Sequence, residues 1–281
     1  MTIFRKIALG TWRTEYDPSV YGTLAFRADA ALEYIRRFRE VTGVRLTLSQ
    51  LMAKALAAAL VEVPEANAIQ RWGKLWLRES VDICFQVMLT DDDEADPPSS
   101  AEPSGKKRKF DLSAVVLRNV AGRDLRDLAE EMQREVDRAR RRENKELERT
   151  RGTFKWLPQI LIHRILNVVS FLSYTLNLDL RWAGLPKDPF GSAMVTNIGA
   201  LGLESAYVPL VPYSRCPLLV ALGAVTDEPV IENGHVVPGK MLRAFATFDH
   251  RIMDGAHAAV MSRVIKAHFD RPFEHFGIVT P

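Results

Sequence analysis

Short β-rich segments alternate with helical segments along this chain, and this alternation constrains the fold more than any other feature. The strand-like segments are rich in β-branched and aromatic residues, whereas the helical segments repeat apolar residues every three or four positions. We expect strands over residues 20–26, 81–89, 110–120, 194–199, 217–225 and 242–248. Strands that alternate with helices in this way favour a mixed α/β sheet covered by helices. We expect residues 1–281 to form one such domain.

The helix expected over residues 48–63 carries the clearest local signals. Thr47 stands three residues before Gln50, which is the spacing of a capping box at a helix start. Apolar residues lie on almost every side of the segment, and Pro64 ends it because proline cannot continue a helix. We therefore expect this helix to lie at the centre of the core.

Composition and charge exclude several classes of protein. A hydrophobic fraction of 47% supplies a sizeable core, and 38 basic against 35 acidic residues leave a net charge of +3, too small to indicate nucleic-acid binding. The charged helix face that runs to Arg151 is expected to be solvated surface. Cys84 and Cys216 are far apart and outside any pairing motif, so we expect neither a disulfide nor a metal site. Without a signal-peptide pattern or a spanning apolar stretch, the chain is predicted to be cytoplasmic, with no transmembrane segment.

The sharpest chemical signal follows the strand expected over residues 242–248. That strand delivers His250 at its end, and Asp254 and Gly255 then turn the chain into an alanine-rich helix. Imidazole titrates nearest neutrality, so a positioned histidine is the usual general base for a thiol or hydroxyl. The remaining histidines stand in no comparable setting: His163, His235, His257, His268 and His275.

The segment Asp249-His250-Arg251-x-x-Asp254-Gly255-Ala256 resembles a known signature. The signature is that of the catalytic domain of dihydrolipoyl acyltransferases, the acyltransferase components of 2-oxoacid dehydrogenase complexes, and chloramphenicol acetyltransferases share its wider pattern. The resemblance spans roughly two thirds of the chain. Further segments fall in family order: Val63-Pro64-Glu65-Ala66-Asn67, Val195-Thr196-Asn197-Ile198-Gly199 and Phe269-Asp270-Arg271-Pro272.

This resemblance implies a chloramphenicol acetyltransferase-like fold and a role for each of four residues. His250 would remove the proton from the thiol of coenzyme A or of a reduced lipoyl group, so that the thiolate attacks an acyl thioester. Thr196 stands where the family has a serine that donates a hydrogen bond to the oxyanion, although a strand threonine also bonds locally. Asp254 would steady the loop that holds the base, with Arg13 as its partner.

The resemblance also implies partners. Coenzyme A or acyl-coenzyme A is the expected substrate, and the active site would lie between two subunits of a homotrimer or of a higher assembly of trimers. We expect neither a lipoyl domain nor a peripheral subunit-binding domain in this chain, so a lipoyl group would sit on a separate carrier protein. An alternative is a non-catalytic oligomeric scaffold or cage-forming homologue of the same core. A two-lobed monomeric condensing enzyme is disfavoured because the chain holds one His-x-x-x-Asp-Gly motif.

Two segments depart from the family pattern. Residues 91–109 combine acidic residues, prolines and a basic run, which is typical of a mobile loop. Residues 141–187 form an insertion with a long apolar stretch that predicts helix. Three interpretations of that stretch, residues 154–180, stay open: extra core or oligomer contact, cover for a substrate channel, or contact with a membrane surface.

Overall fold

The computed structural model describes residues 18–90, 110–140, 159–183, 185 and 187–277, which are built around a seven-stranded sheet. The sheet consists of β1 (Ser19–Arg27), β4 (Ile83–Thr90), β5 (Phe110–Leu117), β6 (Ala193–Asn197), β7 (Leu218–Leu222), β8 (Thr226–Glu232) and β9 (His235–Asp249). Its order is β1-β9-β7-β6-β4-β5, with β8 paired to β9. β6 runs parallel to β4 and β7, and the other neighbours pair antiparallel. The expected mixed sheet is confirmed.

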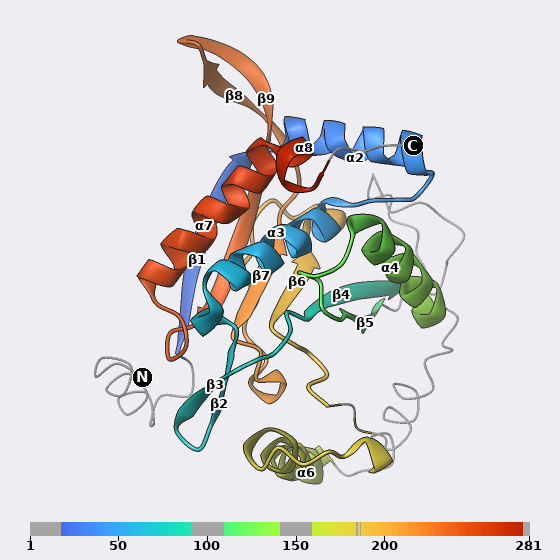
Figure 1. The fold of residues 1–281 in the computed structure, drawn as a ribbon, viewed down its shortest axis with the longest axis vertical. Helices are drawn as coiled ribbons and strands as arrows, with labels where there is room; N and C mark the ends of the chain where they lie inside the picture. The colour runs from blue at the N-terminus through green and yellow to red at the C-terminus, as the bar shows by residue number, and fades with distance from the viewer. Residues whose placement is uncertain (1–17, 91–109, 141–158, 184, 186, 278–281) are drawn as a thin grey trace.

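Helices cover one face of this sheet. They are α2 (Asp29–Thr42), α3 (Leu48–Glu62), α4 (Leu125–Arg140), α7 (Gly255–Asp270) and α8 (Pro272–His275), whereas α6 (Gln159–Ser170) lies apart from them. Figure 1 shows α3, α4 and α7 in front of the strands, whereas α6 lies at the lower end of the molecule beside a separate hairpin. That hairpin pairs β2 (Ala68–Arg71) with β3 (Lys74–Leu77). The main core therefore lies between the sheet and the helices on this face.

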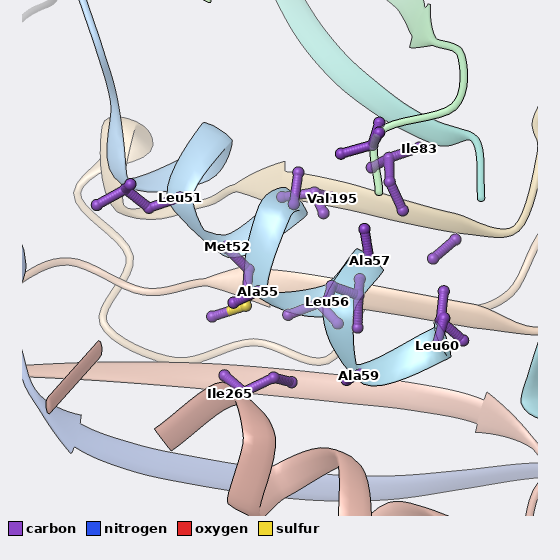
Figure 2. Close-up of a cluster of buried hydrophobic side chains, with 14 of the residues drawn as sticks. Leu51, Met52, Ala55, Leu56, Ala57, Ala59, Leu60, Ile83, Val195 and Ile265 are labelled. Carbon is purple, nitrogen blue, oxygen red and sulfur yellow. The ribbon is translucent and has the colours of Figure 1, made fainter. Parts of the chain in front are cut away.

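The buried helix α3 starts and ends where the sequence predicts. The Thr47 N–H donates to Gln50 Oε1 at 2.8 Å, and the Gln50 N–H donates to Thr47 Oγ1 at 3.4 Å, so the capping box is present. The helix is apolar on nearly every side because it packs against the sheet on one side and α7 on the other. Figure 2 shows its side chains, Leu56 among them, between Val195 of the sheet and Ile265 of α7.

The opposite face of the sheet carries a smaller core that no described helix covers. Cys84, Met194, Leu219 and Phe245 pack there beneath the irregular segment 198–216. Several apolar side chains on this side are exposed, namely Tyr21, Leu201, Leu203, Tyr207 and Val211. In the described part of one chain, this face is thus covered by a loop segment and remains partly open to solvent.

A β-hairpin arm extends beyond the body of the sheet. β8 and the first half of β9 form it, and Figure 1 shows it projecting from the upper end of the molecule. Its two-residue turn uses Asn233 and Gly234, both with positive φ, which suits the twist of a tight hairpin. Ile231 and Val236 pair across the strands near the tip and are both exposed.

The described part of the insertion packs against the body through a few specific contacts. Residues 159–183 form α6, a π-helical turn (Phe171–Thr175) and a 3-10 turn (Arg181–Ala183). The Tyr174 side chain is buried, and its ring meets the ring of Tyr213 edge to face at 6.5 Å. Arg215 Nε donates to Ser170 Oγ at 3.3 Å. Within the described ranges, no helix is both long and apolar enough to cross a membrane.

The structure also adds elements that the sequence pattern did not predict. β2, β3 and β8 were not expected, and β9 begins at His235 rather than at residue 242. β3, β8 and the first part of β9 have almost no buried side chains, and β2 and β3 are only four residues long, so their apolar residues show little regular alternation. The loop predicted over residues 91–109 lies outside the described residues, as do residues 141–158 of the predicted insertion.

Candidate active site

The turn after β9 is anchored by the backbone of Asp249. The Asp249 N–H donates to the carbonyl of Pro217 at 2.9 Å, which ties the end of β9 to the start of β7. The Asp249 carbonyl then accepts from the N–H groups of Ile252 and Met253 at 3.0 and 2.9 Å. Because Ile252 and Met253 are buried, the turn is held on the core from both ends.

His250 sits at the top of this turn and is half-buried. Its N–H donates to the carbonyl of Pro18 at 3.0 Å, which joins the turn to the start of β1. Its ring atom Nδ1 lies 2.9 Å from the Met253 carbonyl oxygen. A carbonyl can only accept, so Nδ1 carries the proton in the neutral ring and Nε2 carries the lone pair. The turn therefore selects the tautomer in which Nε2 is the basic nitrogen.

Asp249 and Arg251 flank the histidine as an ion pair. Arg251 Nη2 donates to Asp249 Oδ2 at 2.7 Å, and Arg251 Nε donates to Asp249 Oδ1 at 3.0 Å. The Arg251 N–H also donates to Asp249 Oδ1, at 2.9 Å. These hydrogen bonds between Asp249 and Arg251 fix the shape of the turn, as expected for residues that hold the base in place. Burial lowers the pKa of the neighbouring Arg215 guanidinium, and the positive charge of Arg251 lowers it further.

Asp254 caps α7 at its first turn. Asp254 Oδ1 accepts from the N–H groups of Ala256 and His257 at 3.0 and 3.2 Å. His257 Nδ1 lies 2.6 Å from the same oxygen, so His257 does share a setting with an aspartate, contrary to the sequence-based expectation. The spacing of three residues at a helix start was the signal that could have indicated this contact. Arg13, the expected partner of Asp254, lies outside the described residues.

Thr196 lies near the end of β6, where the following turn is tightly packed. The Ile198 N–H donates to the Leu222 carbonyl at 2.9 Å. A Cβ on Gly199 would lie 2.6 Å from the backbone of Gly223, so only glycine fits there. Met194 points to the open face of the sheet and Val195 to the helical face, so by alternation Thr196 points to the open face.

Thr196 and His250 lie near opposite ends of the central strands in one chain. Thr196 is level with Ala221 on β7, which is level with Phe245 on β9, and His250 lies five residues further along. At about 3.3 Å per residue along the strand and about 4.8 Å between strands, the two residues are roughly 19 Å apart. Two side chains of this size cannot span that distance, so one chain alone does not bring them together.

Other chemistries find little support in the described residues. Burial raises the pKa of the Cys84 and Cys216 thiols to about 12 each, so both stay protonated near neutral pH and neither is an activated nucleophile. The described residues contain no group of three or more histidine, cysteine or acidic side chains that could hold a metal ion. The turn at His250 is therefore the best-supported candidate for acid–base chemistry.

Part of the chain matches a known family. Residues 189–276, which include Thr196 and His250, match the model of the 2-oxoacid dehydrogenases acyltransferase (catalytic domain) family. The predicted resemblance to this family is confirmed. The family match begins just before β6, so the similarity proposed for the end of α3 lies outside it.

Two curated proteins resemble a short stretch of this chain. One is the dihydrolipoyllysine-residue acetyltransferase component of the acetoin cleaving system of Bacillus subtilis, 35% identical over 78 residues. The other is the probable dihydrolipoyllysine-residue succinyltransferase component of the 2-oxoglutarate dehydrogenase complex of Schizosaccharomyces pombe, 34% identical over 83 residues. The matches cover 28 and 29% of this chain and only 19 and 18% of those proteins.

Solved structures share the acyltransferase-type fold over nearly the whole chain. The dihydrolipoamide acetyltransferase of Azotobacter vinelandii superposes with a TM-score of 0.62 at 18% identity, over 96% of this chain and 88% of that one. The cubic core of a pyruvate dehydrogenase multienzyme complex gives 0.62 at 19% identity with the same coverage. At these identities the comparison establishes the fold alone.

Proposed function

We propose that this chain is a coenzyme A-dependent acyltransferase. It would move an acyl group between coenzyme A and a thiol of the dihydrolipoyl type, or another acceptor, with His250 as general base. The observation that carries the proposal is the 2.9 Å contact between His250 Nδ1 and the Met253 carbonyl. This contact makes Nε2 the basic nitrogen, and it lies inside the stretch that matches the acyltransferase family.

The proposed reaction transfers one proton and exchanges one thioester bond. His250 Nε2 takes the proton of the attacking thiol, which is only a few per cent ionised at neutral pH because its ordinary pKa is about 8.5. The thiolate attacks the thioester carbonyl carbon and forms a tetrahedral oxyanion. The oxyanion collapses as the carbon–sulfur bond to the departing thiolate breaks, and that thiolate recovers the proton from His250.

The Thr196 hydroxyl is the proposed donor to the oxyanion. A hydrogen bond to a developing negative charge stabilises the transition state more than the substrate, which is how such donors accelerate acyl transfer. The solved Azotobacter enzyme was studied for the catalytic roles of a serine, a histidine and an asparagine four residues after that histidine. Here Asp254 stands four residues after His250, where its role as a helix cap supports a positioning function. Arg13 stays its proposed partner.

The active site is proposed to form between copies of the chain. Thr196 and His250 lie roughly 19 Å apart within one copy by the strand spacings, so they can serve one substrate only if they come from two copies. The partly open face of the sheet offers apolar area for that contact. A closed trimer satisfies both conditions, and the structural relatives include the core of a multienzyme complex. A lipoyl acceptor, if used, would be carried by a separate protein.

A non-catalytic scaffold is the alternative. It would need the open sheet face but would not need a histidine whose tautomer is set by a neighbouring carbonyl. Isothermal titration with coenzyme A separates the two, because a scaffold has no reason to bind it.

The proposal is tested by replacing His250 and assaying acetyl transfer from acetyl-coenzyme A to dihydrolipoamide. We expect His250→Ala to lower kcat about 100-fold to 10,000-fold, the usual cost of losing a general base, while the molar mass stays unchanged. His235→Ala is the matched control because His235 is exposed on the hairpin arm, and it should leave kcat unaltered. Equal kcat values for wild type and His250→Ala would overturn the assignment.

A further inference from the structure

Exposed aromatic and aliphatic side chains are concentrated in two segments, the β2–β3 hairpin and residues 171–182. We call this surface the tryptophan patch and define it by Trp72, Trp76, Leu77, Phe171, Leu178 and Trp182. Its three tryptophans are 66, 52 and 85% exposed in chain order. Tryptophan is normally well buried in soluble proteins, so three exposed tryptophans in one region indicate a surface that is covered by something else.

The patch is continuous across two segments that are distant in the sequence. Trp72 belongs to the β2–β3 hairpin and Phe171 to the turn after α6, and their rings meet edge to face with centroids 6.0 Å apart. Figure 1 shows the hairpin and α6 at the same end of the molecule. The contact joins the two segments, so Trp72 and Phe171 share one exposed surface.

The segment 171–182, which carries half of the patch, packs against the body of the protein on its other side. Tyr174 is buried, and Ser170 Oγ accepts from Arg215 Nε, so this side of the segment faces the body of the protein. Burial raises the pKa of the Tyr174 hydroxyl, which therefore stays neutral in this position. With Tyr174 directed inward, Phe171 and Leu178 remain exposed.

Positive charge is concentrated in the same two segments. Residues 68–79 and 159–190 together hold six basic and three acidic residues: Arg71, Lys74, Arg78, Arg164, Arg181 and Lys187 against Glu79, Asp179 and Asp188. Their net charge of +3 equals that of the whole chain, so the rest of the chain is neutral on balance. Arg78 is nearly buried and pairs with Asp188, and Arg181 pairs with Asp179, so the exposed excess of positive charge comes from Lys74, Arg164 and Lys187. Exposed apolar side chains in segments with an excess of positive charge match a negatively charged, partly apolar partner.

We propose that the tryptophan patch binds the surface of an anionic phospholipid bilayer. Tryptophan side chains prefer the boundary between headgroups and acyl chains, and lysine and arginine beside them are attracted by anionic headgroups. Because no described helix could cross a bilayer, the binding is peripheral. This inference goes beyond the proposed acyl transfer and does not rest on it.

A second copy of the chain fits the patch less well. A two-fold contact would place the same surface against itself, and both surfaces would carry the same positive charge. Like charges that face each other across an interface oppose association. The bilayer meets no such repulsion.

The test is sedimentation of the purified full chain with phospholipid vesicles. We expect binding to vesicles of phosphatidylcholine with about one-third phosphatidylglycerol, and clearly weaker binding to phosphatidylcholine alone. The double variant Trp72→Ser, Trp182→Ser should bind the anionic vesicles at least about tenfold more weakly, since it removes two large apolar side chains from the contact. Lys74→Gln with Arg164→Gln should reduce the preference for anionic lipid.

The matched control is the double variant Ile231→Ser, Val236→Ser. It removes two apolar side chains that are just as exposed, but on the hairpin arm at the far end of the molecule, so vesicle binding should match that of wild type. Circular dichroism confirms that each variant is folded. Failure of the wild-type protein to bind anionic vesicles would overturn the proposal. So would a fall in molar mass of the tryptophan variant with no change in vesicle binding, because the patch would then be a contact between copies.

Discussion

Two variants that are each inactive should recover activity when their subunits are mixed, if Thr196 and His250 act together only across a subunit boundary. The first variant is His250→Ala, which lacks the base. The second is Thr196→Val, which keeps the shape of the side chain but lacks the hydroxyl. Loss of one oxyanion donor typically lowers kcat about 100-fold to 1,000-fold, so both parents should be nearly inactive.

The size of the recovery follows from the register of the sheet. Because the two residues lie roughly 19 Å apart in one chain, every proposed site takes His250 from one copy and Thr196 from its neighbour. In an equal, random mixture, half of the copies supply an intact His250 and half supply an intact Thr196. An intact pair therefore occurs in about one quarter of the sites, whatever the size of the closed ring. The mixture should reach about 25% of wild-type kcat.

The assay unfolds the two variants in urea, mixes and refolds them, and measures acetyl transfer to dihydrolipoamide. Each variant refolded alone is the control for partial recovery, and light scattering confirms that the mixture forms the wild-type oligomer. Activity of the mixture that stays at the level of its parents would refute a shared site. Full activity of Thr196→Val alone would show instead that Thr196 is not the oxyanion donor.

Three further predictions concern stability and the turn that holds the base. Leu56→Ala should lower the free energy of unfolding by about 2–5 kcal/mol in urea denaturation, because Leu56 is fully buried between the sheet and α7. Asp254→Ala should lower that free energy by about 0.5–2 kcal/mol through loss of the α7 cap and should reduce kcat, whereas Asp254→Asn, which can still cap, should retain most stability. Burial lowers the pKa of His268, and the ring of His275, which stacks on it at 4.5 Å, and the charge of Lys54 act in the same direction. Folding therefore favours neutral His268, so the free energy of unfolding should be highest above about pH 6.5 and should fall as the pH drops below that value. His268→Gln should weaken this pH dependence, which thermal melts at several pH values would measure.

The sequence predicted helix starts and strand ends well because the contacts that define them join residues only a few positions apart. Thr47 and Gln50 identify the start of α3 since both hydrogen bonds of a capping box join residues three positions apart. The alternation after residue 242 placed His250 at a strand end for the same reason. By contrast, β8 was missed because a strand with little buried surface shows no regular apolar pattern, and the β2–β3 hairpin was missed because its strands have only four residues each.

The candidate site was predicted residue by residue but not as a geometry. The sequence singled out His250, Asp254 and Thr196 through their resemblance to a family signature. The carbonyl that accepts the hydrogen bond of the His250 ring belongs to Met253, an apolar residue that no sequence pattern could indicate. The contact of His257 with Asp254 was overlooked, although their spacing of three residues at the expected helix start could have indicated it.

What the sequence determined by itself is the type of each local element and the chemistry available at the end of β9. Helix caps, strand alternation and a histidine followed by a turn depend on neighbours within a few residues, and the order of residues contains that information. Only the tertiary structure decided that Thr196 and His250 lie near opposite ends of neighbouring central strands, since the order and direction of strands depend on pairings across the whole chain. It also decided that Tyr174 is buried while Trp72 and Trp182 are exposed. Composition shows which side chains are apolar, but whether they are covered depends on which distant segments pack against them.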